Sequence, residues 1–236
     1  MKLIISDEIR AKYPDLRIGV VVAHDVDNTT YQEGLEEYVE QLFKRFGRKY
    51  ESPHDLEDIP NIMAWRDIYR SFGINPKKKK PTAEALLARA IRSGYVPHIS
   101  PAVDAYLCAE TAHCLPIGGY DLTRITGDIT LKFANGGEEF MGVGAESVEF
   151  TNEGEVIYAD DARVLTRCWN YRDCDFSKID TDTTTLALFS EAALAVITDE
   201  AVKETIEQIS ENLQKYCGAQ CTTLFLSAQQ NELEII

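Results

Sequence analysis

The sequence predicts an α+β protein, a mixed α/β fold in which one sheet or barrel carries an inserted layer of helices. Strand-like apolar runs occur near both ends of the chain, helical periodicities gather between them, and short strands separated by glycine turns fill the second half. The 236 residues are 44% hydrophobic and 27% charged, which is ordinary for a globular protein with a sizeable core. We expect a single domain over 1–236, with its helical insertion at about 59–114.

Helices dominate the first half of the chain. Apolar residues at helical spacing, bounded by proline or glycine, predict helices over 7–13, 31–46, 60–72, 82–94 and 101–114. Gly47 is the expected terminator of the second helix, and Thr82 is the expected N-cap of the fourth. Two apolar runs flanking the first helix predict strands over 2–6 and 16–23.

After residue 115 the pattern changes to short strands with glycine-containing turns. Asn135-Gly136-Gly137 and Asn152-Glu153-Gly154 are typical of hairpin turns. Apolar and β-branched runs predict strands over 129–133, 139–143, 147–150, 156–158, 163–169, 184–189 and 222–226. A long amphipathic segment predicts one further helix over 199–216, with Gly218 at its end.

The distribution of charge restricts the classes of partner. A net charge of -15 argues against general nucleic-acid binding and against DNA as a partner, because phosphate backbones are bound by summed positive charge. Residues 62–94, however, hold eight basic residues against two acidic ones, a net charge of +6. A chain this polarised can present one basic face while the remainder stays acidic.

The sequence contains few features that indicate a cellular compartment, a metal or a cofactor. No apolar run approaches the length of about 20 residues that spans a bilayer, and the N-terminus turns polar too soon for a signal peptide, so we expect a cytoplasmic protein without a membrane partner. The six cysteines are therefore expected to be reduced thiols. Cys217 and Cys221 approach the spacing of a zinc half-site, but no second half follows them. We expect neither a metal nor a cofactor.

Several segments in order carry a resemblance to a known family. They are WRDIYRSFGINP (65–76) and PTAEALLAR (81–89), then VD (103–104) and LPIGGYD (115–121), and finally GEVIYADD (154–161) and LTRCWNYRD (165–173). Together they resemble the tRNA-editing module of the phenylalanyl-tRNA synthetase beta subunit, its third and fourth domains, in free-standing form. The resemblance covers the chain from about residue 59 onward. It implies a mixed-sheet, barrel-like fold and a pocket that hydrolyses a wrongly attached amino acid from tRNA.

This chain departs from the family pattern in two places. Leu107 and Glu110 stand where relatives often carry Asn and Ser after the Val-Asp pair. The stretch that is rich in glycine in the synthetase pocket is here the bulkier Arg167-Cys168-Trp169-Asn170. The tyrosine specificity of the synthetase module therefore does not carry over.

The resemblance and the residue chemistry together suggest a site. Ester hydrolysis needs a positioned water and donors for the developing oxyanion, and Asp104, Tyr120 and Asn170 are the candidate catalytic residues. The expected substrate pocket comprises Gly118, Gly119, Asp121, Arg167, Trp169 and Arg172.

Each of these assignments has a structural alternative. The two glycines can form a tight turn between a helix and a strand, and Trp169 can be a core residue. Arg172 can form an ion pair with Asp160, Asp161 or Asp173. Asp104 and Glu110 offer two carboxylates on one helix, one of which would have a raised pKa if both were buried, but such residues more often cap loops or stay solvated.

Basic residues of the positively charged segment are the candidate contacts for tRNA phosphates. They are Arg66, Arg70, Lys77, Lys78, Lys79, Lys80 and Arg89. Alternatively, Arg66 and Arg89 are ion-pair partners of Glu84 or Asp104, and the lysine run is a solvated loop.

Two functions of different class remain open. The first is an enzyme that deacylates a mischarged aminoacyl-tRNA with a water held in the pocket. The second is a module that binds tRNA, an amino acid or a similar small molecule without catalysis. Aminoacylation is not expected, because the chain shows no glycine-rich nucleotide signature and is too short to hold a full synthetase as well.

Overall fold

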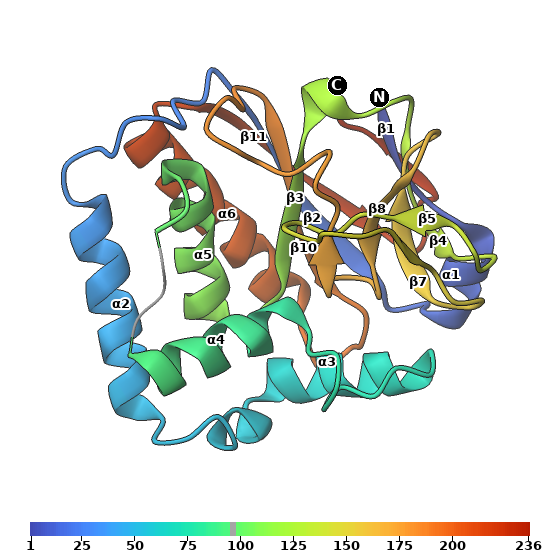
Figure 1. Ribbon diagram of the computed structural model, residues 1–236, viewed down its shortest axis with the longest axis horizontal. Coiled ribbons are helices and arrows are strands. Elements are labelled where there is room, and N and C mark those ends of the chain that lie inside the picture. The colour runs from blue at the N-terminus through green and yellow to red at the C-terminus, as the bar shows by residue number, and fades with distance from the viewer. Residues whose placement is uncertain (95–97) are drawn as a thin grey trace.

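The computed structural model describes residues 1–94 and 98–236, and in them the strands form three open sheets (Figure 1). The largest sheet has six strands in the order β12-β1-β4-β7-β8-β9. It is mixed, because β1 pairs parallel with β4 whereas its other neighbours pair antiparallel. Its strands are β1 (Lys2–Ile5), β4 (Ile129–Phe133), β7 (Val156–Ala159), β8 (Val164–Arg167), β9 (Arg172–Asp173) and β12 (Glu232–Glu234).

The second sheet is antiparallel and has four strands in the order β11-β2-β10-β3. Its strands are β11 (Gln220–Ser227), β2 (Arg17–His24), β10 (Leu186–Ala192) and β3 (Ile117–Asp121). A small third sheet pairs β5 (Glu139–Phe140) with β6 (Glu149–Phe150). The mixed α/β class expected from the sequence is confirmed, whereas the described strands do not close into a barrel.

Helices lie against one face of the four-stranded sheet and below both larger sheets (Figure 1). The longer ones are α2 (Leu35–Lys49), α3 (Pro60–Ser71), α4 (Thr82–Ser93), α5 (Pro101–His113) and α6 (Asp199–Cys217), and shorter ones are α1 (Asp7–Lys12), η1 (Asp55–Asp58) and η2 (Leu122–Arg124). Helices α2, α5 and α6 share a hydrophobic cluster with the four-stranded sheet. None of the described helices combines the length and apolar character needed to cross a bilayer.

Strand β2 shows how the sequence divides the core. Its side chains alternate between two faces, as in any strand, and nearly all are buried. Val20 and Val22 pack into the cluster shared with the six-stranded sheet, whereas Val21 and Ala23 pack into the cluster shared with the helices. The four-stranded sheet is thus the middle layer, which is why β2 reads as a continuous apolar run.

Several predicted boundaries need correction. Gly47 does not end its helix, because α2 continues to Lys49, where the ring of Phe46 contacts Tyr50 and the backbone N–H of Tyr50 bonds to the Phe46 carbonyl. Thr82 is the first helical residue of α4, and Pro81 is its N-cap. Strand β8 ends at Arg167 because Cys168 and Trp169 adopt positive φ angles of 47° and 71°.

Other strands differ in extent. The predicted strands over 139–143 and 147–150 shorten to the two-residue β5 and β6, and Gly142 forms a single bridge with Cys174. Strand β10 is longer than expected and continues to Ala192. The sequence reasoning missed β9 and β12, and it considered Gly118 and Gly119 as a turn although they lie inside β3.

Candidate functional site

A cavity of about 190 Å³ lies between the six-stranded and four-stranded sheets, and we call it the inner cavity. Its walls come from both sheets and from the segment that links β8 to β9. Strands β3 and β10 contribute Ile117, Gly118, Tyr120, Phe189 and Glu191, strands β7 and β8 contribute Tyr158 and Thr166, and Thr82, Val143, Trp169, Asn170, Tyr171, Arg172 and Asp173 complete the lining.

Glu191 places a carboxyl in an otherwise apolar part of the core. Side chains of Phe189 and Glu191 lie on the same face of β10, because alternate residues of a strand point the same way. Glu191 is buried, and the hydroxyl of Tyr158 donates a hydrogen bond to its Oε1 atom. Burial raises the pKa of Glu191 to about 7, so its charge changes near neutral pH.

A second carboxyl, that of Asp173, ends a chain of hydrogen bonds. The Tyr120 hydroxyl lies 2.6 Å from Thr166 Oγ1, and Thr166 Oγ1 donates to Asp173 Oδ1 over 2.5 Å. Burial raises the pKa of Asp173 to about 6, and the bond from Thr166 opposes that rise. A Cβ atom added at Gly118 would lie 3.7 Å from Asp173 Oδ1, so a glycine there keeps the space beside the carboxyl open.

Trp169 and Asn170 bring unpaired donors to the inner cavity. Trp169 is fully buried against Tyr13 and Trp65, so it is a core residue as well as a lining residue. The indole Nε1 and the Asn170 Nδ2 form no hydrogen bond with the described residues, although both lie close enough to Glu191 to oppose the rise in its pKa. Tyr69 holds the Asn170 side chain by donating to its Oδ1 over 2.8 Å. Both N–H groups therefore lie beside the Glu191 carboxyl at the wall of the inner cavity.

Asp104 does not belong to this cavity. Its carboxylate, which is 2% exposed, lies 2.6 Å from His98 Nδ1 and accepts hydrogen bonds from the Tyr31 hydroxyl and the Ile99 backbone. These contacts fix the start of α5, which is the capping alternative. Glu110 is buried on the same helix and accepts a bond from the Ile117 backbone over 3.5 Å; burial raises its pKa well above the usual range.

Asp121 and Arg167 also occupy structural positions instead of the expected pocket. The Asp121 carboxylate accepts bonds from the Thr123 backbone and from the Thr183 hydroxyl, which fixes η2. Arg167 makes a two-pronged pair with Glu155, with both N–O distances at 2.8 Å. Although burial opposes it, the hydrogen bonds from Arg167 lower the pKa of Glu155 to about 2.

Arg172 lines the inner cavity as expected, but its structural partner is not one of the predicted aspartates. Its Nη1 atom lies 3.7 Å from Glu149, and its Nη2 atom donates to the Val143 carbonyl over 2.9 Å. Arg172 therefore anchors the β5–β6 region beside the cavity mouth while its charge stays partly exposed.

The basic residues divide into a buried group and an exposed group. Arg66 is 1% exposed and pairs with Glu84 and Glu57 at 3.1 and 3.0 Å, which is the ion-pair alternative and removes it from any surface contact. Lys80 also pairs with Glu84. The exposed members are Arg70, which pairs with Asp67, together with Lys77, Lys78 and Arg89.

Lys79 connects the basic segment with the inner cavity. Its ammonium group lies 5.4 Å from the centre of the Tyr171 ring and 3.4 Å from Cys168 Sγ. At the start of α4, the Thr82 backbone N–H bonds to the Asn170 carbonyl over 3.2 Å. The lysine run is thus attached to the strand end that forms the cavity wall.

Sequence reasoning missed the residues that carry most of the site chemistry. Glu191, Tyr158 and Thr166 were not singled out, and Asp173 was considered only as an ion-pair partner. Glu191 did leave a signal, because it is a lone charged residue within the apolar run from Leu186 to Leu194. A buried charge in such a run either has a partner or a function.

The fold and the site define a mixed α/β protein whose two larger sheets enclose a cavity lined by carboxyls and tyrosines. A family model, the B3/4 domain, matches residues 64–226, and the chain belongs to that family. The resemblance to the third and fourth domains of the synthetase beta subunit is thereby confirmed. No curated protein matches the chain.

One similar solved structure is an N-terminal fragment of the phenylalanyl-tRNA synthetase beta-subunit from Pyrococcus horikoshii. Its TM-score is 0.47 and its sequence identity 11%, and the match covers 94% of this chain and 53% of that fragment. The chain therefore spans about half the length of the fragment.

Proposed function

We propose that this protein hydrolyses the ester of a mischarged aminoacyl-tRNA, acting in trans on tRNA charged by another enzyme. The proposal is supported by membership of the B3/4 family and by one observation above all. The Asp173 carboxyl stands at the wall of a cavity, has a pKa raised to about 6, and keeps one oxygen free of the Thr166 hydrogen bond. A carboxylate in such a position can accept a proton from water near neutral pH.

The chemistry needs no protein nucleophile. A water molecule attacks the ester carbonyl carbon and passes a proton to Asp173. The bond between the carbonyl carbon and the ribose oxygen then breaks, and the ribose oxygen leaves as a hydroxyl by taking that proton from Asp173, which releases the amino acid with a free carboxyl group. Thr166 and Tyr120 orient Asp173, and the N–H groups of Trp169 and Asn170 lie beside Glu191 and favour its ionised form. The Glu191 carboxylate suits the α-ammonium group of the amino acid. In this scheme Asp173 replaces Asp104 as the base.

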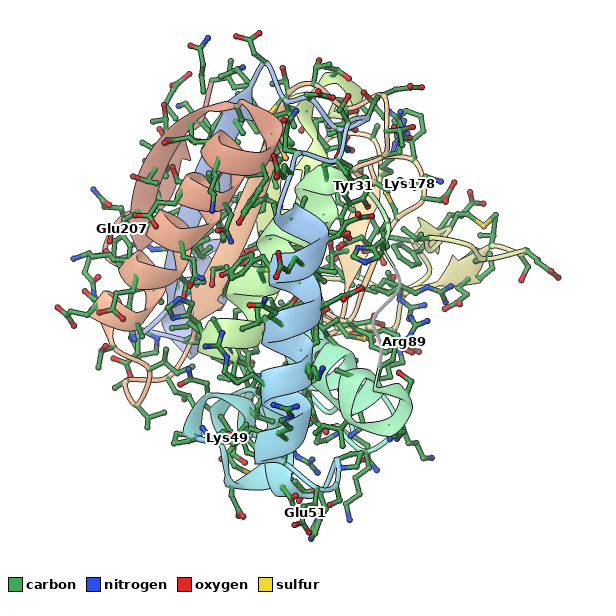
Figure 2. The ribbon with its side chains drawn as sticks, turned by 90° about the vertical axis from the view of Figure 1, so that its left-hand side faces the viewer. Tyr31, Lys49, Glu51, Arg89, Lys178 and Glu207 are labelled. Carbon is green, nitrogen blue, oxygen red and sulfur yellow. The ribbon has the colours of Figure 1, made fainter. Side chains whose placement is uncertain are left out.

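The basic segment supports a tRNA substrate. Lys77, Lys78 and Arg89 are exposed, and Lys79 and Thr82 tie the segment to the cavity wall. Figure 2 has Arg89 and Lys178 on one side of the molecule and Glu207 of the acidic α6 on the other. If the basic side binds the tRNA phosphates, the aminoacylated 3′ end of the tRNA would lie toward the cavity mouth.

The experiment is release of amino acid from a panel of correctly and wrongly charged tRNAs. Wild type should release one class selectively, and Asp173→Asn should lose at least about 100-fold in rate, the usual contribution of a general base. Asp182→Asn removes an exposed carboxyl and is the matched control, which should keep the wild-type rate. No release from any tRNA would contradict the proposal.

Non-catalytic binding of a free amino acid is the second candidate. It is favoured by the presence of two carboxyls in one small cavity, because a carboxylate there suits the ammonium group of a free amino acid as well as that of an ester. Calorimetric titration with free amino acids separates the two functions. Tight binding of a free amino acid without release from its charged tRNA would favour the module without catalysis.

A further inference from the structure

A second cavity, of about 370 Å³, adjoins the inner cavity, and we call it the outer cavity. Asp173 and Val143 line both cavities, so the carboxyl of Asp173 stands at their junction. The remaining walls are mainly apolar and come from the start of α5, from β3 and from the segment before β10. They include Val103, Tyr106, Gly119 and Ile179. A space of this size and character suits a flat heterocyclic ring.

The outer cavity contains a free sheet edge at Gly119. Among the residues that the structure describes, strand β3 pairs with a single strand, β10, on one side, and Leu122 and Asp121 show the alternation of its hydrogen bonds. Leu122 N–H bonds toward β10, to the Thr185 carbonyl, whereas Asp121 N–H points the other way, to the Ser177 carbonyl. Gly119, two residues from Asp121, therefore also directs its N–H and C=O away from β10.

Neither backbone group of Gly119 has a partner among the described residues. An unpaired donor and acceptor of a single residue thus face the outer cavity side by side. Gly119 has a packing role as well, since a Cβ atom there would lie 2.4 Å from the Ala187 carbonyl. A second unsatisfied group is the Ser100 hydroxyl, which is 2% exposed, lines the same cavity and bonds to no described residue. Buried polar groups are normally paired, so three such groups at one cavity point to a polar ligand.

We infer that the outer cavity binds adenosine, with the adenine base read by the free edge of β3. Adenine presents an amino donor beside a ring nitrogen acceptor, which complement the C=O and N–H of Gly119. Tyr106 offers a ring for stacking, and apolar contacts with Val103 and Ile179 cover the faces of the base. The ribose then lies toward Asp173. This inference rests on the proposed function, because it assigns a subsite to the terminal nucleoside of the tRNA substrate.

Adenosine could come from the 3′ end of a tRNA or from a free nucleotide, and the geometry favours the tRNA end. Asp173 joins the outer cavity to the inner one, so a ribose beside it would carry its ester into the inner cavity. Lys178 lines the outer cavity on the same side of the molecule as Arg89, where further phosphates of the strand would lie (Figure 2).

Titration of ¹⁵N-labelled protein with AMP, followed by amide NMR, tests the inference without any hydrolysis. The Gly119 amide should shift strongly downfield as it gains a hydrogen bond, whereas the Gly118 amide, already bonded to β10, is the internal control and should move little. N6,N6-dimethyl-AMP lacks the amino donors and should bind about tenfold more weakly, the effect of losing one or two hydrogen bonds. Equal binding of UMP, or no change at Gly119 with AMP, would overturn the inference.

Variants of Tyr106 test the stacking contact. Tyr106→Ala should weaken AMP binding by about tenfold, and Tyr106→Phe keeps the ring and should bind as wild type does. Equal affinity of all three proteins would overturn the assignment of the cavity. The trinucleotide CpCpA separates the two sources, because a phosphate added to its 3′ oxygen should abolish binding if that oxygen faces Asp173.

Tolerance of the 3′ phosphate would overturn the tRNA-end orientation. The inference and the proposed function are tested by separate measurements, since AMP binding at Gly119 is measured without an aminoacylated tRNA. A protein that binds AMP at Gly119 but releases no amino acid would refute only the hydrolysis.

Discussion

Asp173 and Glu191 are two carboxyls that burial holds close to neutrality. Both have pKa values raised by burial, to about 6 and about 7, and each has a hydroxyl partner on the six-stranded sheet. Because their ordinary values lie near 4, the two groups are proton acceptors and donors in the pH range in which enzymes work. These two carboxyls therefore carry the proposed chemistry, and the dependence of activity and stability on pH tests them most directly.

The pH profile of hydrolysis should follow Asp173. Since Asp173 must be ionised as the base and Glu191 must be ionised to hold the ammonium group, kcat/KM should rise with pH up to about 7, most steeply below pH 6, and then level off. Asp173→Asn should lower the rate at least about 100-fold and remove the steepest part of this rise, and Asp182→Asn should leave the profile unchanged. A wild-type rate that falls between pH 5 and 6.5 would contradict the assignment of Asp173 as the base.

Glu191 should make the fold less stable as pH rises. Its folded pKa of about 7 exceeds the unfolded value of 4.5, so between these values the folded state binds more protons than the unfolded state. Its contribution to the free energy of unfolding should fall by at most about 1.4 kcal/mol per pH unit in that window. Glu191→Gln removes this loss, so its stability relative to wild type should increase from pH 4.5 to 7 in urea titrations. A constant difference would argue against a neutral buried Glu191.

Single residues were the hardest part to predict from the sequence. Gly118, Tyr120, Trp169, Asn170 and Arg172 do line the inner cavity, because they flank strand ends that the motifs had located. In the sequence, Asp104, Asp121 and Arg167 were equally suitable as site residues. In the structure, their side chains bind other groups outside the inner cavity. Which carboxyl receives a capping partner and which faces a cavity depends on packing between distant segments, and a linear pattern does not contain that information.

At the scale of elements, the loop between α3 and α4 holds a run of positively charged lysines beside the wall of the inner cavity. Lys77 and Lys78 are exposed, Lys79 lies over the Tyr171 ring, and α4 begins with a bond from Thr82 to Asn170. One side of the loop therefore contacts the cavity wall, and the other side is exposed to solvent. Its exposed lysines can meet a polyanion without disturbing the core.

Charge reversal at Lys77 and Lys78 should weaken the binding of the tRNA substrate. The double change to Glu should raise KM about tenfold and reduce the salt slope of kcat/KM by about 2, since each phosphate contact contributes about 1. Lys44→Glu on the exposed face of α2 is the control and should leave the slope unchanged. Unaltered tRNA kinetics in the double variant would show that this loop does not contact the substrate.

Elements were predictable in proportion to their length. The helices over α3, α5 and α6 follow from apolar periodicity and their proline or glycine boundaries, and β2 follows from its apolar run. Strands β9 and β12 have two and three residues and form only because a distant strand pairs with them. Local propensity is too weak to reveal such elements.

On the scale of the whole molecule, the expected single domain stays a prediction. Trp169, which follows β8, contacts two aromatic rings of the helical insertion: Trp65 of α3, with ring centres 5.3 Å apart, and Phe72, with ring centres 6.2 Å apart. Each tryptophan is packed at this contact, so its fluorescence reports on the contact as well as on its own element. Comparison of each signal with circular dichroism shows whether the insertion and the sheets unfold together.

Single-tryptophan variants should therefore unfold together in urea. Trp169→Phe leaves Trp65 as the reporter of the insertion, and Trp65→Phe leaves Trp169 as the reporter of the sheets. In each variant the fluorescence transition should coincide with the far-UV circular dichroism transition, as two-state behaviour requires. A Trp65 signal that changes at lower urea than the circular dichroism of the same protein would contradict the single domain.

The two ends of the described chain lie beside one another (Figure 1). The Met1 ammonium group bonds to the Ile236 carbonyl over 2.8 Å, and β12 pairs with β1. A fold with adjoining ends behaves as a cassette, because a host protein can receive it at a single surface loop without stretching either connection. The same geometry makes this chain suitable for circular permutation, with new ends cut into an exposed turn and the old ones joined by a short linker.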